Sequence, residues 1–263
     1  MSTLTPTVPV GTPESGSVAP VVDIEQHSIV RTVALSWLPG LVALGVYLLS
    51  APWVIALGLP ADFVVVLLAL PACVILFEMG YLLYEGKRRN GKFRLDGIVL
   101  YRKSMPIWQY GVFVLLLVAW NAAVYMPLLD LTGGWIKNAV YFWAPSWFLA
   151  ESNFAQYPQN IVLVLALVSI SAYTLFGALE ELYFRGYLLP RISRFGVWAP
   201  VLNTALFTVY HFDILQNAVA IFVGFLPIAL LTWRKQNVYL AMITHAVVNL
   251  IASLIGFLPV LMG

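Results

Sequence analysis

Long apolar stretches separated by short polar segments dominate this chain from about residue 30 onward. A helix that crosses the hydrocarbon core of a bilayer needs about 20 mostly apolar residues. The pattern therefore predicts an all-α, polytopic membrane bundle of about seven transmembrane helices, with six or eight as alternatives because the fifth and sixth stretches are short. The expected spans are roughly 32–50, 62–84, 107–126, 160–179, 198–212, 216–233 and 238–258.

The composition supports a membrane protein. The 263 residues are 61% hydrophobic and only 10% charged, whereas a soluble domain has about 25% charged residues. Residues 1–27 are rich in Pro, Ser, Thr and Val and lack the basic and apolar regions of a signal peptide. We expect them to form a mobile cytoplasmic tail before a single transmembrane domain at 28–263.

The basic residues predict the orientation. Segment 86–104 holds seven of the fourteen lysines and arginines, and seven spans would put twelve of the fourteen on one side. Loop 127–159 on the other side has Lys137 as its only basic residue and is rich in Trp, Tyr and Phe. By the positive-inside rule the N-terminus is cytoplasmic and the C-terminus lies outside. We expect the aromatic loop to lie at the headgroups, with a substrate-capturing lid as the alternative.

Two adjacent carboxylates follow the fourth apolar stretch, in the segment EELYFR. Acids in or near a membrane are costly and mark functional sites by default. Glu181 and Arg185 are four residues apart on one helical face, which suits an ion pair. Glu180 points about 100° away and is left to face a different neighbour, which a simple salt-bridged helix end does not explain.

Two further polar clusters lie downstream. Phe207 is one helical turn before His211, and His245 is one turn before Asn249. Each pair has a structural interpretation, as a satisfied helix-end histidine or as an interhelical hydrogen bond. The functional interpretation is a proton-transfer histidine together with a pair of donors that stabilise an oxyanion.

The three clusters EExxxR, FxxxH and HxxxN, in this order on consecutive late helices, resemble the signature motifs of the CPBP intramembrane proteases, also called the Abi family. This family includes the type II CAAX prenyl endopeptidases and bacterial proteins linked to bacteriocin processing. The resemblance covers about residues 160–255, and no motif position departs from the pattern. It implies a helical bundle with a conical cavity open toward the cytosolic side, and a metal-independent, glutamate-dependent endopeptidase.

The resemblance also implies roles for single residues. Glu180 and His211 would bind and activate the attacking water, and Glu181 and Arg185 would position that pair. His245 and Asn249 would form the oxyanion hole, and Phe207 would line the cavity.

The implied partners are a membrane-associated or prenylated peptide or protein, cleaved near the cytoplasmic face, and the surrounding lipid bilayer. We expect no nucleic acid partner and no cofactor. We also expect no metal, because HExxH is absent and the three histidines lack ligand spacing within one segment. Two other functions stay open. One is a non-proteolytic scaffold or bacteriocin-immunity protein. The other is a proton-coupled transporter, although the chain shows no internal repeat.

Overall fold

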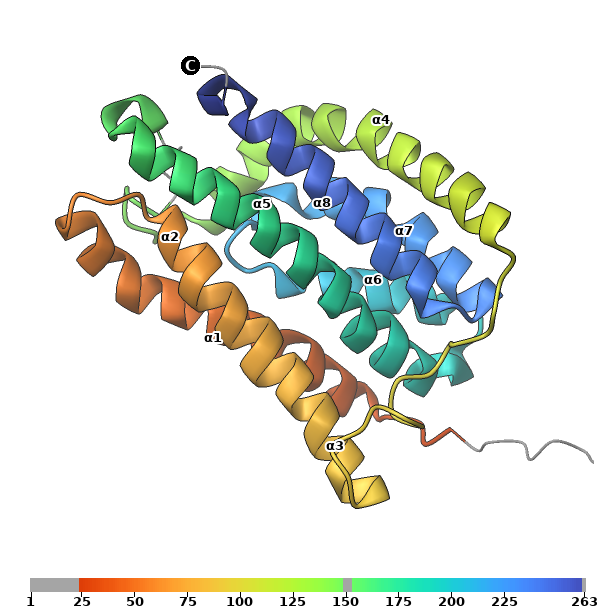
Figure 1. Ribbon diagram of the computed structural model, residues 1–263. Coiled ribbons are helices and arrows are strands. Elements are labelled where there is room, and N and C mark those ends of the chain that lie inside the picture. Colours follow the sequence, from red (N-terminus) through yellow and green to blue (C-terminus); the bar gives the residue numbers. More distant parts are fainter. Residues whose placement is uncertain (1–23, 149–152, 262–263) are drawn as a thin grey trace, which may run out of the picture.

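The computed structural model describes residues 24–148 and 153–261, which form a bundle of helices with no strand in these ranges (Figure 1). Two helices contain stretches of π or 3-10 geometry. Asp62–Asn90 joins α2 (Asp62–Val64), the π-helical η1 (Val65–Ala69) and η2 (Pro71–Met79), and α3 (Gly80–Asn90). Gln159–Phe195 joins α5 (Gln159–Glu181), the π-helical η4 (Leu182–Leu188) and the 3-10 helix η5 (Leu189–Phe195). The remaining helices are α1 (Ile29–Ala56), α4 (Ile107–Val140), α6 (Trp198–Tyr210), α7 (Ala218–Lys235) and α8 (Val238–Leu261), with short 3-10 turns η3 (Phe154–Gln156) and η6 (Leu215–Asn217).

Six helices are long and apolar enough to cross a membrane, which confirms the all-α membrane fold. The seventh helix, α6, corrects the span expected at 198–212. Its 13 residues extend about 20 Å, less than the roughly 30 Å of a hydrocarbon core. The helix ends at His211, whose ψ of 62° leaves the helical range. The turn that carries His211, at the end of the FxxxH cluster, therefore lies inside the bundle rather than beyond a complete span.

Helix α4 continues past its expected end. It runs to Val140 with Pro127 inside it, so residues 127–140 of the expected loop 127–159 are helical. In a bilayer, unpaired backbone groups are costly, so one hydrogen bond lost to proline is a smaller cost than an exposed loop. The segment after α4 packs its aromatic rings together: Phe148 lies 5.4 Å from Tyr141 and 5.6 Å from Tyr47.

Three backbone hydrogen bonds gather distant segments at one end of the bundle. The amide of His27 donates to Arg191 at 2.8 Å, that of Leu100 to Gly186 at 2.8 Å, and that of Lys103 to Gln236 at 3.0 Å. We call this the basic end, because twelve of the fourteen lysines and arginines lie on its segments. These segments are 24–31, 87–106, 186–197 and 234–238.

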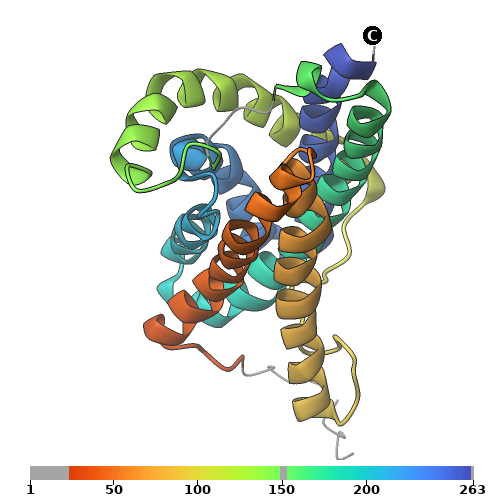
Figure 2. The ribbon, with the colours of Figure 1, turned by 90° about the vertical axis from the view of Figure 1, so that its left-hand side faces the viewer.

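The opposite end is formed by the connections at 57–61, 141–148 and 153–158 and by the last turns of α8 (Figures 1 and 2). There the rings of Phe154 and Phe257 stack at 5.6 Å. The Tyr141 hydroxyl donates to the Phe212 carbonyl at 2.7 Å and accepts from the Leu215 amide at 2.6 Å. Tyr141 thus braces the turn that follows α6.

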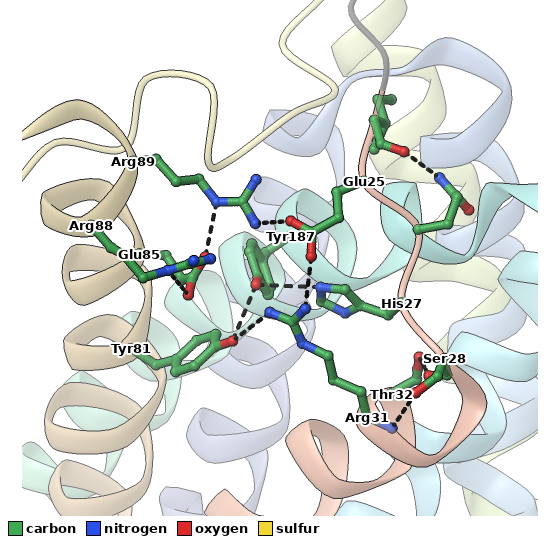
Figure 3. A network of polar contacts seen from close by, with 12 residues as sticks. Glu25, His27, Ser28, Arg31, Thr32, Tyr81, Glu85, Arg88, Arg89 and Tyr187 are labelled. Carbon is green, nitrogen blue, oxygen red and sulfur yellow. Dashed lines mark hydrogen bonds and ion pairs between the residues drawn. The ribbon is translucent and has the colours of Figure 1, made fainter.

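Most of the tail expected at 1–27 lies outside the described residues. The part that is described, from Ile24 onward, is extended and bonded to the bundle (Figure 3). His27 is fully buried, and Glu25 forms ion pairs with Arg31 and Arg89. Residues 24–27 are therefore a docked segment rather than part of a mobile tail.

Candidate active site

The carboxylate of Glu181 holds two partners deep in the bundle. Its Oε1 lies 2.9 Å from Nδ1 of His245 on α8, and its Oε2 lies 3.2 Å from Nε of Arg185 in η4. Glu181 and Arg185 are both 0% exposed. The ion pair predicted from their spacing is present, and a buried pair of this kind becomes strongly destabilising when one partner is removed.

The guanidinium of Arg185 is also covered by an aromatic ring. Its central carbon lies 4.1 Å from the centroid of Phe207. The same ring contacts His211 edge-on at 4.8 Å and His245 at 6.0 Å. Phe207 therefore fixes the spacing between the arginine and two histidines, and it also lines the cavity.

Glu180 faces a different group of neighbours, as the 100° offset predicts. The Tyr210 hydroxyl donates to its Oε1 at 3.1 Å. A hydroxyl has one hydrogen, so Sγ of Cys73, 2.9 Å away, is the donor toward the Tyr210 oxygen. Glu78 lies next in this group, fully buried and 3.9 Å from Sγ of Cys73. The Glu78 side chain therefore points inward, toward this group.

His211 is held by its own helix. Its Nδ1 lies 2.9 Å from the Phe207 carbonyl oxygen. A carbonyl only accepts, so Nδ1 carries the proton and the neutral ring presents an unprotonated Nε2. This tautomer allows Nε2 to accept a hydrogen bond from a water molecule.

His245 and Asn249 converge on one point beside α5. An ideal Cβ on Gly177 would lie 2.5 Å from Asn249 Nδ2 and 3.0 Å from His245 Nε2. Both side chains therefore occupy the space that a larger residue at 177 would fill. Asn249 Nδ2 donates one hydrogen to the Tyr173 carbonyl at 2.9 Å, which leaves its second hydrogen for another acceptor.

These groups border a cavity of about 790 Å³. Its lining includes Glu180, Phe207, His211, His245 and Asn249, whereas Glu181 and Arg185 lie behind it. The structure thus brings all seven predicted residues together. Five of them face the cavity, and Glu181 and Arg185 contact two of those five, His245 and Phe207, from behind.

The cavity runs away from the basic end. From Glu180 it extends to Asp62 at the start of α2, Tyr47 near the end of α1 and Phe257 near the end of α8. The resemblance implies a cavity open toward the cytosolic side; the described lining extends away from the basic end.

Sequence reasoning missed three contributors. Tyr210 has no spacing signal, since it is simply the residue before His211. Gly177 is one turn before Glu181. A small residue at this position is a signal for close approach of two helices, but the sequence pattern does not distinguish it from the other glycines of the chain. Cys73 lies in an apolar run of the sequence, which gives no sign that it is buried beside the acid cluster.

Comparison with known proteins adds one match. The family model described as "Type II CAAX prenyl endopeptidase Rce1-like" matches residues 158–251. This range starts one residue before α5 and ends within α8, so it contains all three motifs. No curated protein and no solved structure matches the chain.

Proposed function

Residues 158–251 belong to the Rce1-like type II CAAX prenyl endopeptidase family, a family of glutamate-dependent membrane proteases, and from this premise we propose which residues hydrolyse the peptide bond. The observation that carries the proposal is the division of the two adjacent acids. Glu180 borders the cavity, whereas Glu181 is enclosed between His245 and Arg185. One acid is thus available to substrate and water, and the other supports the site.

Water activation falls to Glu180 and His211. Both border the cavity, and the hydrogen bond from Nδ1 to Phe207 leaves Nε2 of His211 as an acceptor. A water molecule held between the two donates one hydrogen to each. Glu180 removes a proton from the water as its oxygen attacks the carbonyl carbon of the scissile bond. The Tyr210 hydroxyl keeps the Glu180 carboxylate in one orientation.

The oxyanion formed by this attack is stabilised by His245 and Asn249. These residues offer Nε2 and the second hydrogen of Nδ2 at the same place, beside Gly177. Because Nδ1 of His245 donates to Glu181, Nε2 carries a hydrogen only when the ring is the imidazolium. Glu181 is the counter-ion of that form at 2.9 Å, and Arg185 holds the other oxygen of the Glu181 carboxylate in place at 3.2 Å.

Collapse of the tetrahedral intermediate breaks the carbon–nitrogen bond. The proton that Glu180 took from water passes to the leaving nitrogen, which departs as an amine, and the new carboxyl end keeps the water oxygen. Glu180 returns to its starting state, so the cycle consumes only water. We place this reaction on a peptide or protein associated with the membrane.

The test is cleavage by the purified, full-length protein in liposomes. A panel of membrane peptides, with and without a prenyl group, is incubated with the wild type, with Glu180→Gln, and with Asp130→Asn as a matched acid-to-amide control on the exposed face of α4. We expect cleavage by the wild type and the control, and loss of at least about 100-fold in Glu180→Gln. The expected activity survives chelators.

Two results would contradict the proposal. One is cleavage by folded Glu180→Gln at the rate of the wild type, which would remove Glu180 from the chemistry. The other is activity abolished by a chelator and restored by a divalent metal, which would replace the glutamate-dependent mechanism. If no peptide is cleaved by any variant, complementation in cells with Glu180→Gln separates a missing substrate from a non-proteolytic scaffold.

A further inference from the structure

The ends of three helices meet at one surface of the basic end. Helix α4 begins at Ile107, α7 ends at Lys235 and α8 begins at Val238. We call segments 101–108 and 233–239, which lie side by side here, the junction (Figure 1). All three helices belong to stretches that are long and apolar enough to cross a membrane. The junction therefore lies where they leave the hydrocarbon, at the level of the lipid headgroups.

A short antiparallel contact joins the two segments of the junction. The Lys103 amide donates to the Gln236 carbonyl at 3.0 Å, and the Val238 amide donates to the Tyr101 carbonyl at 2.7 Å. Between these bonds lies Asn237, which is fully buried and whose Nδ2 donates to the Lys103 carbonyl at 2.7 Å. The start of α8 is thereby tied to the segment that leads into α4.

Tyr101 and Gln236 have an unusual backbone conformation. Their φ angles are 58° and 51°, and in the described part of the chain all other residues with positive φ are glycines. A side chain makes this conformation costly, and such strain persists only where the surrounding structure imposes it, often at functional sites. Both residues accept a hydrogen bond across the junction. The strain therefore marks the junction as a candidate site.

Three cations surround the antiparallel contact. Lys103 and Arg234 are exposed. Lys235 is half-buried, with its Nζ 5.1 Å from the ring centroid of Phe113 near the start of α4. The amide of Lys103 is bonded to Gln236, the residue that follows Lys235. The contact thus brings three positive charges, which come from segments far apart in the sequence, to one small surface.

The acids described at the basic end are engaged with other cations. They form the ion pairs Glu25–Arg31, Glu25–Arg89, Glu85–Arg88, Glu85–Arg89 and Asp96–Arg102. Among the described residues, Lys103, Arg234 and Lys235 form no ion pair. Neighbouring charges of one sign repel, and an anion bound between them offsets that repulsion. The surface is therefore complementary to a negatively charged group.

Exposed apolar side chains frame the three cations. Ile107 and Trp108, on the first turn of α4, are 84% and 64% exposed, and Tyr239, on the first turn of α8, is 41% exposed. Tryptophan and tyrosine are enriched at the level of the headgroups. A soluble phosphate or a phosphopeptide would leave these side chains in water, whereas a phospholipid contacts them with its acyl chains. The arrangement favours a lipid.

We propose that the junction binds the headgroup of an anionic phospholipid. The phosphate lies among Lys103, Arg234 and Lys235, and the acyl chains run along α4 from Trp108. The site is separate from the hydrolytic one, because no residue of the junction borders the cavity beside Glu180. A lipid held in this way contacts both segments of the junction, so it stabilises the contact that fixes the start of α8.

Lipid binding by the purified, full-length protein in detergent micelles tests the proposal without any need for turnover. Phosphatidylglycerol and phosphatidylcholine are added in turn, and bound lipid is counted by native mass spectrometry. The site variant carries Lys103→Gln, Arg234→Gln and Lys235→Gln. Each cation near an anionic lipid contributes about a fivefold gain in affinity. We expect the wild type to prefer phosphatidylglycerol by at least about tenfold, and the site variant to lose this preference.

A control variant removes the same charge elsewhere on the basic end. It carries Lys92→Gln, Arg94→Gln and Arg194→Gln, at three exposed positions whose side chains form no ion pair with any described residue. We expect it to keep the preference of the wild type. An equal loss in the two variants would mean diffuse attraction by the whole basic end and would overturn the assignment to the junction. A wild type that binds both lipids equally would overturn it as well.

Hydrogen exchange reports whether the lipid acts at the junction. The Val238 amide, which donates to the Tyr101 carbonyl, is present in all three proteins. We expect phosphatidylglycerol to raise its protection at least about tenfold in the wild type and the control, and to leave it unchanged in the site variant. Protection of the wild type that stays constant while phosphatidylglycerol binds would place the lipid elsewhere, against the proposal.

Two further additions distinguish the lipid from other anions. Inorganic phosphate and a phosphoserine peptide are added in place of lipid, at the same concentration of phosphate. We expect neither to protect the Val238 amide. Protection by either one that equals the effect of phosphatidylglycerol would replace the lipid with a soluble anion.

Folding of the variants is compared first, as the unfolding temperature in phosphatidylcholine. We expect one value for the three proteins, because substitutions at surface positions have small effects on stability. If the site variant unfolds at a lower temperature, Lys103→Gln with Arg234→Gln takes its place, since both positions are exposed. The same loss of preference for phosphatidylglycerol is expected of this double variant.

Discussion

Nδ1 of His245 lies 2.9 Å from Oε1 of Glu181, so a residue that never touches the cavity decides which hydrogen His245 can offer to it. With Nδ1 engaged, the ring donates from Nε2 only as the imidazolium. The Glu181 carboxylate is the counter-ion of that form, and opposite charges at this distance attract strongly in a desolvated site.

Glu181→Gln should therefore lower kcat while leaving KM nearly unchanged. The amide oxygen can still accept from Nδ1, but it carries no charge to stabilise the imidazolium. We expect a loss of roughly 100-fold in kcat, measured on the best peptide of the panel. Loss of one partner of a buried ion pair also costs about 3 kcal/mol or more of stability, so thermal unfolding is measured beside activity.

Asn249→Ala is the companion to this variant. It removes the other oxyanion donor and should cost about 100- to 1,000-fold in kcat. Because both changes weaken the same interaction, the double variant should lose less than the product of the two single losses. Fully multiplicative losses, or an unaltered kcat in folded Glu181→Gln, would show that Glu181 does not act through His245.

Gly177→Ala should disable the site through one methyl group. The new Cβ would lie 2.5 Å from Asn249 Nδ2 and 3.0 Å from His245 Nε2, so both donors must move. A displacement of about 1 Å can cost on the order of 100-fold in rate, and that is the expected loss in kcat. Stability should change far less than activity, since Asn249 can swing toward the cavity.

Gly134→Ala is the matched control, because a Cβ at this position on the exposed face of α4 meets nothing within 4 Å. Replacing a helical glycine by alanine there should keep activity and raise stability by about 0.5–1 kcal/mol. Equal activity of the two variants would rule out the convergence of His245 and Asn249 beside Gly177 as a requirement for catalysis.

The sequence was sufficient for the pairs that lie within one helix. The i,i+4 spacing of Glu181 with Arg185 and of His245 with Asn249 predicts a shared face, and the all-α membrane fold follows from the lengths of the apolar stretches. Those features depend only on local geometry, which a regular helix fixes without reference to the rest of the chain.

Features that depend on packing between helices were not predictable in this way. The inward position of Glu78, the contact of Tyr210 with Glu180, and the shortness of α6 arise from how α2–α3, α5 and α6 meet. The direction of the cavity is of the same kind. Nothing in the EExxxR spacing tells which way the cavity extends from Glu180, because this depends on how the other helices pack around α5.

Tyr210→Phe should reduce catalysis without disturbing the aromatic packing. The ring, which lies 4.9 Å from Phe184 and 4.8 Å from His211, is retained. The hydroxyl that donates to Glu180 is lost, and a hydrogen bond to a charged group is worth about 1.5–3 kcal/mol. We therefore expect kcat/KM to fall roughly 10- to 100-fold.

The pH–rate profile distinguishes this role from a structural one. If Tyr210 orients and stabilises Glu180, the profile of Tyr210→Phe should shift along the pH axis as well as fall. A profile that keeps its shape, with a lower unfolding temperature, would mean that the hydroxyl serves packing alone. Tyr125→Phe is the matched control, since its hydroxyl accepts from Asn217 at 2.9 Å and not from an acid of the site.

The docking of the N-terminal segment should weaken in acid. Burial, and then the positive charges of Arg31 and Arg191, lower the pKa of His27 from 6.5 to about 4. Between these values the undocked segment binds a proton that the docked one excludes, so docking is lost progressively as the pH falls from about 6.5 toward 4 and is unaffected above that window. The ion pairs of Glu25 resist this loss of docking in acid. Burial raises the pKa of Glu25, but the hydrogen bonds from Arg31 and Arg89 outweigh burial and lower that pKa.

Hydrogen exchange at the His27 amide, which donates to the Arg191 carbonyl at 2.8 Å, measures this docking directly. After correction for the intrinsic rate, its protection should fall roughly tenfold between pH 7 and pH 5. His27→Phe keeps a ring against Tyr187 but has no group that titrates, so its protection should stay level across the same range. An equal fall in both variants would assign the pH dependence to another group, and protection of the wild type that is constant down to pH 5 would mean that His27 accepts its proton while docked.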